Sequence, residues 1–295
     1  MLASRKGYDV FVSDSGKVKE KYKEVLEANN ILWEEGMHTE EKILNADEII
    51  KSPGISEKTP LIKKLMEKNI PVISEIEFAG RFTNAKMICI TGSNGKTTTT
   101  LLTYHILKNA GLNVGLGGNV GKSFAWQVAE NDFDYYVLEL SSFQLDNMYN
   151  FRSDIAILLN ITPDHLDRYD YKLENYADSK FRIAQNQRDD DAFVFCADDE
   201  ITVRELPKHN IKAKMYPFSI KKEIKEGAYL DSTNNNLNIN LNNQTFTMSI
   251  FDLALHGKHN AYNSMAAGIA ARILDIRIDV MRERLSDFQN LEHRL

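Results

Sequence analysis

The sequence has little of what marks secreted, membrane-spanning or nucleic-acid-binding proteins. Its only two cysteines, Cys89 and Cys196, lie in apolar strand-like segments, so we expect buried free thiols and no disulfide framework. The longest apolar runs, such as 155–159, are far shorter than a membrane span, and the N-terminus lacks a secretory signal pattern. The net charge of −6 comes from interspersed acids and bases, which leaves no basic surface for nucleic acid. We therefore expect a soluble cytoplasmic protein, and we predict a monomer.

Length and composition predict a globular protein of two domains. Domains usually have about 100–200 residues, and a chain of 295 residues with 43% hydrophobic side chains can bury a sizeable core. The changes of pattern along the chain place one domain at 1–85 and a second at 86–291. Residues 292–295 are then the start of a third region.

Residues 1–85 have the pattern of an incomplete Rossmann-like domain. A helix end at 2–6 is stopped by Gly7, a strand is expected at 8–12, and Asp14 comes just beyond that strand. In a nucleotide-binding β–α–β unit, a strand and a glycine-rich turn precede such a helix, and the acid after the next strand binds a sugar or base. That first strand and turn are absent here. Strands at 48–50 and 71–74, with a helix at 61–67, complete the expected elements.

From residue 86 onward, predicted strands alternate with helices. This pattern, with nearly all-apolar strands, indicates an α/β fold with a mostly parallel sheet covered on both faces. The strands are expected at 87–91, 114–116, 135–140, 154–160, 192–196 and 213–217. The helices are expected at 97–110, 121–129, 175–186, 259–274 and 280–288. The segment 228–250 alternates apolar and polar residues around Asn242-Asn243, which predicts a small antiparallel hairpin, and the asparagines at 234–236 predict a turn.

The most informative stretch is the run from Ile88 to Thr99, where an apolar strand leads into Gly92, Gly95, Lys96 and three threonines. A strand–loop–helix of this kind surrounds an anion with backbone N–H groups, the helix N-terminus and a lysine charge. The first hydroxyl after the lysine, Thr97, is placed to hold the Mg²⁺ of a nucleotide. The loop is shorter than the standard eight-residue phosphate loop, so we predict a P-loop-type central domain of an unusual kind. The alternative is a glycine-rich turn capped by threonines.

Four further polar groups lie at or after the ends of the later segments, where ligands bind in open α/β sheets. Glu139 ends a buried strand and is suited to Mg²⁺, although position alone would equally allow a strand-end cap. The glycine-rich run 117–121 with Asn119 offers a flexible backbone surface or a plain turn. His165, between two aspartates, could bind a metal or be a surface residue. Lys180 lies on a helix, where a solvated lysine is the ordinary interpretation.

Taken together, these motifs resemble those of the muramyl ligases, the ATP-dependent amide-forming enzymes of peptidoglycan precursor synthesis. The short loop 91–98 is similar to theirs, and the segment 139–145 (Glu-Leu-Ser-Ser-Phe-Gln-Leu) resembles that of the D-glutamate-adding members. The resemblance covers essentially the whole chain. Its other motifs are Ser52-Pro53-Gly54, Asp164-His165-Leu166-Asp167-Arg168-Tyr169, Gly257-Lys258-His259-Asn260 with Asn263, and Glu292-His293-Arg294.

The resemblance implies roles for particular residues. It implies that ATP is bound by the loop and by a second group of residues, namely Gly92, Ser93, Asn94, Gly95, Lys96, Thr97, Thr98, Asn260, Asn263 and Arg294. It implies two Mg²⁺ sites and catalytic roles for Lys96, Glu139, His165 and Lys180, with Thr97, Glu139, His165 and a carbamylated Lys180 facing the metals. It implies that the UDP-sugar substrate is contacted by Asp14, Ser15, Ser52, Pro53, Gly54, Asn119, Ser141 and Gln144.

The implied reaction joins D-glutamate to UDP-N-acetylmuramoyl-L-alanine through an acyl phosphate, with positioning and charge neutralisation as the task of the protein. Relative to the family pattern, the first N-terminal strand and a C-terminal amino-acid-binding domain after Arg294 are missing from this sequence. On that basis we expect the 295-residue chain alone to have little or no ligase turnover.

Two other interpretations remain. The chain could belong to a sister ligase of the same superfamily, such as another muramyl ligase or a folylpolyglutamate synthase, although the segment Ser141–Gln144 argues against those. It could also be a nucleotide-binding module that senses or sequesters ATP without catalysis.

Overall fold

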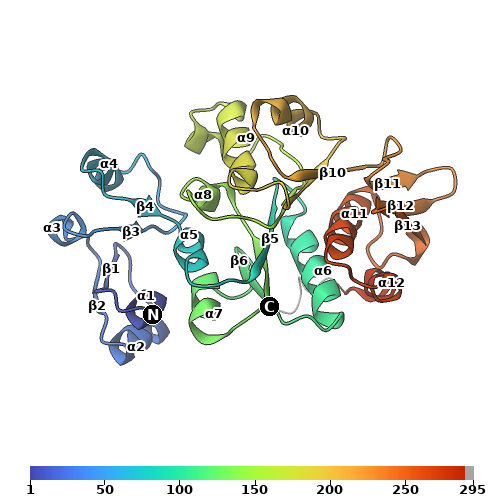
Figure 1. The fold of residues 1–295 in the computed structure, drawn as a ribbon. Coiled ribbons are helices and arrows are strands. Elements are labelled where there is room, and N and C mark those ends of the chain that lie inside the picture. Colours follow the sequence, from blue (N-terminus) through green and yellow to red (C-terminus); the bar gives the residue numbers. More distant parts are fainter. Residues whose placement is uncertain (290–295) are drawn as a thin grey trace.

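The computed structural model describes residues 1–289 and has three layers around a nine-stranded sheet (Figure 1). The order of strands in this sheet is β13-β12-β11-β10-β9-β8-β5-β7-β6. All neighbours from β6 to β11 run parallel, whereas β11, β12 and β13 pair in antiparallel fashion. The strands are β5 Lys86–Thr91, β6 Val114–Gly118, β7 Tyr135–Glu139, β8 Ile155–Leu158, β9 Ala192–Cys196, β10 Lys214–Ser219, β11 Gly227–Asp231, β12 Asn236–Leu241 and β13 Gln244–Ser249.

Helices cover both faces of this sheet. They are α6 Lys96–Asn109, α7 Phe124–Glu130, α8 Ser142–Leu145, α9 Leu173–Phe181, α10 Glu200–Glu205, α11 Lys258–Ile273 and α12 Ile278–Asp287, with 3₁₀ turns at Leu166–Tyr169, Arg182–Ala184, Leu206–Lys208 and Ile250–Asp252. Alternate residues of β5 point to opposite faces, and both sets are buried. Ile88 and Ile90 pack in the core with α6 and α11, whereas Met87 and Cys89 pack in the core with α7 and α9. A strand with two buried faces must be apolar throughout, as the sequence pattern indicated.

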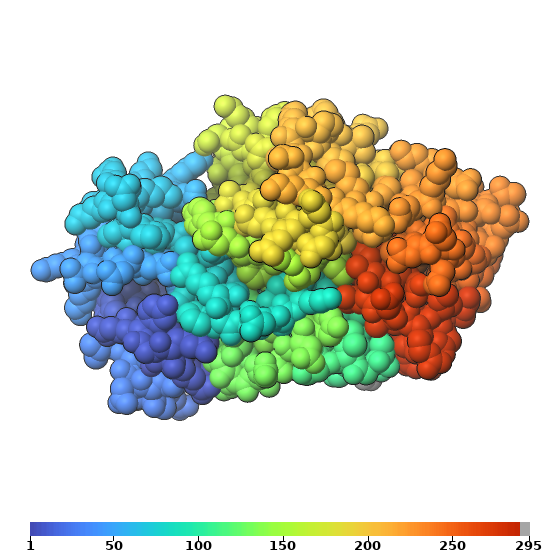
Figure 2. All heavy atoms as spheres, viewed as in Figure 1, coloured from blue at the N-terminus to red at the C-terminus, as the bar shows by residue number. Residues whose placement is uncertain are grey.

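The N-terminal part is built from short elements. They are α1 Leu2–Arg5, β1 Phe11–Asp14, α2 Glu20–Ala28, β2 Leu32–Glu35, α3 Glu40–Ile43, β3 Ile49–Ile50, α4 Pro60–Glu67, β4 Val72–Ile73 and α5 Glu75–Gly80. They form two separate parallel pairs, β1-β2 and β3-β4. Figure 2 shows this part, in blue and cyan, lying against one side of the green and yellow central part. The proposed domain boundary near residue 86 stays a prediction.

The structure confirms the α/β fold class with a mostly parallel sheet, the antiparallel strands near the end of the chain, and the turns at Asn235 and Asn242-Asn243, which have positive φ. Both cysteines are buried and free, as expected. Within residues 1–289, no helix is long and apolar enough to cross a membrane.

Three expectations about local structure were wrong. Asp14 is the last residue of β1 and does not lie beyond it, because the strand runs from 11 to 14. The helix expected from Gly121 begins only at Phe124, because Gly121 adopts φ +81 and Ser123 caps the first turn by accepting from the Trp126 N–H. The elements α2, β2 and α5 were not expected at all.

Candidate active site

The loop predicted to bind phosphate lies between β5 and α6. Gly95 immediately precedes α6 and adopts the left-handed conformation with φ +82. A Cβ atom at this position would lie 2.5 Å from the Asn263 side-chain oxygen, so glycine is needed for both backbone and space. Thr97 and Thr98 are in the first turn of α6, next to the unpaired N–H groups of its N-terminus. The loop therefore has the geometry of an anion site.

Two lysines converge on this loop from different helices. Lys96 Nζ donates to the carbonyl oxygens of Gly92 and Ser93, at 3.0 Å each. Lys180 lies on α9, 88 residues after Gly92 in the sequence. It donates to the same Gly92 oxygen at 2.8 Å and lies over the Tyr176 ring. Lys180 is only 1% exposed, so its interpretation as a solvated lysine is wrong.

Burial and mutual repulsion shift the titration of these lysines. Burial, together with the neighbouring Lys96 charge, lowers the pKa of Lys180 to about 7, against the opposing effects of Asp164 and Asp146. Burial also lowers the pKa of Lys96, opposed by the charges of Glu139 and Asp164. Near neutral pH a sizeable fraction of Lys180 is therefore an uncharged amine.

A buried carboxylate faces the loop from the end of β7. Glu139 is 2% exposed, accepts the Thr97 hydroxyl at 2.8 Å, and accepts the Asn119 amide at 3.0 Å. The Asn119 backbone N–H also donates to the Glu139 carbonyl at 2.8 Å. Gly118 makes this approach possible, because a Cβ there would lie 2.2 Å from the Glu139 carbonyl oxygen. Three residues predicted separately thus form one cluster of oxygen and amide groups.

The other predicted residues surround this cluster at different distances. His165 is exposed in the loop after β8, with Asp164 at 3.5 Å and its ring centroid 5.2 Å from that of Phe143. The structure does not bring His165 into hydrogen-bond contact with Glu139 or Lys180. Ser141 and Gln144 form a capping box at the start of α8, so their side chains bond to each other and to the helix end.

The second group of predicted ATP-binding residues lies on α11. Asn263 accepts the Thr99 hydroxyl at 3.1 Å and donates to Asn260 at 3.2 Å, which joins α11 to α6 directly behind the loop. Arg294 lies outside the described residues. Of the N-terminal residues, Asp14 accepts the Gly16 N–H and Ser15 is exposed, and both lie on the far side of the molecule from α11 (Figure 1). Ser52–Gly54 form the loop after β3, which contacts the loop after β8.

Two models of protein families match the chain. The Mur ligase middle domain matches residues 90–271, and the MurD N-terminal domain matches residues 1–61. The first of these covers more than half of the chain. The chain belongs to the Mur ligase family. Its phosphate loop, Glu139 and Lys180 all lie within the part that matches the middle domain of this family.

Similar curated proteins are named UDP-N-acetylmuramoylalanine–D-glutamate ligase. Those of Bacteroides fragilis and Porphyromonas gingivalis are 60% and 53% identical to the chain, over 295 and 296 residues that span its whole length. The chain covers 66% of the length of each relative.

Among solved structures, a Mur ligase fold is evident at low identity. A UDP-N-acetylmuramate:L-alanyl-γ-D-glutamyl-meso-diaminopimelate ligase from Neisseria meningitides aligns with a TM-score of 0.67 and 19% identity, over 99% of this chain and 94% of that chain. A pseudomurein peptide ligase from Methanothermus fervidus aligns with a TM-score of 0.56 and 22% identity, over 98% and 67% of the two chains.

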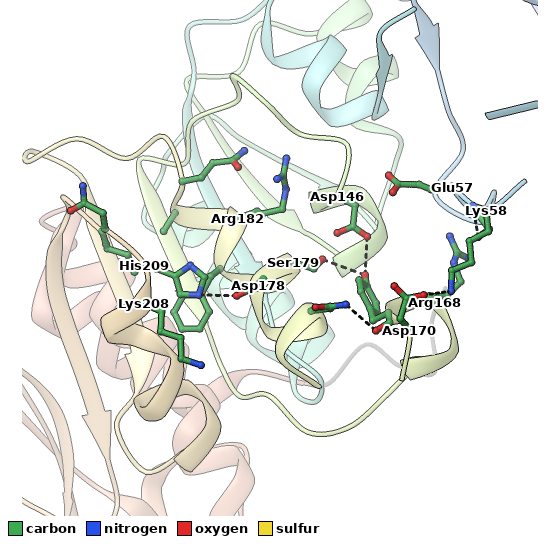
Figure 3. Close-up of a pocket in the computed structure, with 18 of the residues that line it drawn as sticks. Glu57, Lys58, Asp146, Arg168, Asp170, Asp178, Ser179, Arg182, Lys208 and His209 are labelled. Atoms are coloured by element: carbon green, nitrogen blue, oxygen red, sulfur yellow. Dashed lines mark hydrogen bonds and ion pairs between the residues drawn. The ribbon is translucent and has the colours of Figure 1, made fainter. Parts of the chain in front are cut away.

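Two features of this Mur ligase site were missed by the sequence reasoning. Asn160, just after β8, accepts the Asn94 N–H at 2.9 Å and donates to the Asn94 carbonyl at 3.0 Å, and so braces the phosphate loop from the neighbouring strand. The sequence analysis included Asn160 as the last residue of the strand expected at 154–160 and gave it no role of its own, whereas β8 ends at Leu158. The second feature is a pocket of about 1010 Å³ between residues 56–58, the helix α4, the helix α9 and residues 208–212 (Figure 3). It is lined by none of the predicted site residues.

Proposed function

We propose that the protein is a cytoplasmic, ATP-dependent ligase that joins D-glutamate to UDP-N-acetylmuramoyl-L-alanine in peptidoglycan precursor synthesis. The observation that carries the proposal is the cluster in which the Thr97 hydroxyl and the Asn119 amide meet on the buried Glu139 carboxylate beside the loop 92–98. The names of relatives at 53–60% identity supply the substrates. The two buried free thiols agree with a reducing compartment.

The donor set at this cluster fits Mg²⁺. Thr97 and Glu139 offer hydroxyl and carboxylate oxygens, which are the ligands Mg²⁺ prefers alongside phosphate oxygens and water. In our proposal they hold one Mg²⁺, and His165 with Lys180 serves a second. When bound, the ions neutralise the charge that develops on the transferred phosphoryl group.

In our proposal Lys180 acts as a carbamate. The neutral amine is the reactive form, and burial together with the Lys96 charge favours it. Its nitrogen lone pair attacks the carbon of CO₂, a C–N bond forms, one C=O π bond becomes a carboxylate, and the nitrogen proton is released to water. The product carries the negative charge that an unmodified lysine cannot supply to a metal.

The chemistry requires positioning more than it requires acid–base groups. The L-alanyl carboxylate attacks the γ-phosphorus of ATP, which breaks the bond to ADP and gives an acyl phosphate. The amine of D-glutamate then attacks the activated carbonyl, loses a proton and expels phosphate. Lys96 and the N–H groups of the loop face the β- and γ-phosphates and balance their charge through both steps. Asn119 orients Glu139, and Asn263 holds the start of α6 in place.

The test compares Lys96→Ala with Lys108→Ala, a control at the exposed far end of the same helix α6. Calorimetry on the 295-residue chain measures ATP affinity, which we expect to fall at least about tenfold for the first variant only. ADP release that requires both UDP-N-acetylmuramoyl-L-alanine and D-glutamate is measured on the complete gene product, because the chain covers 66% of its relatives. Activity with another UDP-muramyl acceptor alone, or nucleotide binding without amide formation by the complete product, would overturn the proposal.

A further inference from the structure

Two loops that are far apart in the sequence are tied together beside the site. Arg168, in the loop after β8, donates from Nη1 to the Gly54 carbonyl and from Nη2 to the Ile55 carbonyl, at 3.2 Å each. Lys58 makes the reverse contact, from Nζ to the Asp167 carbonyl at 3.1 Å and to the Asp170 carboxylate at 2.8 Å. Figure 3 shows Lys58, Arg168 and Asp170 grouped at one end of the pocket.

Arg168 also contacts a third segment. Its guanidinium carbon lies 4.4 Å from the ring centroid of Phe143 on α8, a distance typical of cation–π contact. That ring also lies beside His165 and stacks with Tyr169, both from the same loop as Arg168. A single side chain therefore joins the loop of Ser52–Gly54, the loop of His165, and the helix α8 that Ser141 caps.

The loop that carries His165 needs support from outside. His165, Asp170 and Tyr171 have φ values of +49, +55 and +58, a region that side chains other than glycine rarely adopt. Such conformations persist only where the surroundings impose them. The contacts of Arg168 and Lys58, with the Tyr169 hydroxyl on Asp146 at 2.9 Å, supply that restraint.

We propose that Arg168 is a positioning residue that fixes the distance between the 52–58 loop and His165. The inference rests on the proposed function, in which His165 serves the second Mg²⁺. It takes the first loop to hold the nucleotide-sugar end of the acceptor, as the family resemblance implies, and that Mg²⁺ to lie near the reacting carboxylate of the acceptor. One guanidinium then holds the two segments that face the two ends of this substrate at a fixed separation. A lysine cannot replace it, because one ammonium lacks the planar fork that spans two carbonyls while stacking on a ring. A small misplacement of the carboxylate lowers the rate of its attack.

The first test is kinetic and compares Arg168→Lys with Arg182→Lys in the complete gene product. Arg182 is a matched control, because it too donates to two carbonyls (Leu145 and Met148) and lies over a ring, that of Tyr149. For Arg168→Lys we expect the KM for the UDP-sugar acceptor to rise about tenfold, equivalent to about 1.4 kcal/mol, and kcat to fall. The KM for ATP should change by less than about twofold, and millimolar guanidinium ion should restore part of the activity of Arg168→Ala. A variant with unchanged acceptor KM, or with both KM values raised together, would refute the inference.

The second test does not depend on catalysis. Hydrogen exchange on the 295-residue chain should become faster in both 52–58 and 162–171 for Arg168→Lys, and in neither for Arg182→Lys. If the wild type forms no amide bond, the proposed function fails. This measurement still decides whether Arg168 holds the two loops together. If exchange in Arg168→Lys is unchanged in either loop, Arg168 does not hold the two loops together.

Discussion

Replacing Lys180 tests whether a buried cation beside the phosphate loop opposes folding. The pKa of this lysine is lowered from its usual value near 10.5 to about 7, because burial and the Lys96 charge disfavour the protonated form. One pKa unit is about 1.4 kcal/mol, so protonated Lys180 should destabilise the folded chain by about 5 kcal/mol below pH 7.

The sign of the pH dependence follows from the protons bound in each state. Between pH 7 and pH 10.5 the unfolded chain keeps the Lys180 proton and the folded chain has lost it, so stability rises with pH in this window. The destabilisation of the folded chain by Lys180 is about 4 kcal/mol at pH 7 and about 2 kcal/mol at pH 9. Lys180→Met removes the charge with little change of volume. Between pH 7 and pH 9, the free energy of unfolding should therefore increase by about 2 kcal/mol more for the wild type than for Lys180→Met.

Urea unfolding followed by circular dichroism, in buffer freed of CO₂, measures this difference. The exposed Lys225→Met is the control and should show no such change. Lys96→Met provides a second check, because removing the neighbouring charge should raise the pKa of Lys180 and move the stability gain to higher pH. Adding bicarbonate should raise the stability of the wild type near pH 7, and not that of Lys180→Met, if the buried amine forms a carbamate. A wild type that parallels Lys180→Met from pH 7 to pH 9 without CO₂ would refute the assignment of a desolvated lysine.

Four further substitutions, one of them a control, test local features. Gly118→Ala should destabilise the chain by about 3 kcal/mol or more and weaken Mg·ATP binding, because its Cβ meets the Glu139 carbonyl. Gly111→Ala is the control: it has φ +87 but no atom near the added Cβ, so it should lower the free energy of unfolding by only about 1–2 kcal/mol. If urea unfolding shows equal losses for both variants, the close approach of Gly118 to Glu139 does not matter for stability. Ser141→Ala removes the cap of α8 and should cost about 1 kcal/mol by thermal unfolding, so an unchanged Tm would refute the role of the capping box. Glu77→Gln should lower the free energy of unfolding by about 1–3 kcal/mol, because the buried carboxylate accepts the N–H groups of residues 149–151. A smaller loss in urea unfolding would mean that these N–H groups are solvated.

The sequence predicted the elements whose signal is local. The strand β5, the loop and α6 were placed to within a residue, because an apolar run followed by Gly95-Lys96 leaves few alternatives. In the N-terminal part, β3 and β4 lie within the strands expected at 48–50 and 71–74, and β1 overlaps the strand expected at 8–12, but β2 gave no such signal. The strand β2 has four residues, none of them buried, and its Leu32 is 71% exposed, so neither burial nor alternation marks it.

The candidate site was predictable to a similar extent. Glu139 and Asn119 follow strands that are neighbours in a parallel sheet, so their meeting follows from topology. The burial of Lys180 was not predicted, because a lysine on a helix is ordinarily solvated. Its neighbours Tyr176, Ala177 and Phe181 on α9 are buried too, and its amine bonds to the carbonyl of Gly92 in the loop. Its role entered only through the family resemblance.

The contacts that join the N-terminal part to the sheet explain why their relative placement could not be read from the sequence. Some of these contacts are apolar, since Leu2, Ile76 and Phe78 are buried in one core with residues of the sheet and of α7. Others pair cations with backbone carbonyls or carboxylates with N–H groups: Arg5 with Ala129, Arg168 with Gly54, and Glu75 with Ala125. A carbonyl carries no side-chain signature, and the partners of Arg168 are 114 and 113 residues away. Polar contacts of this kind exchange with water at low net cost, since each contributes only about 1–3 kcal/mol. The shared apolar core, more than these polar contacts, therefore holds α1 and α5 against the sheet and α7.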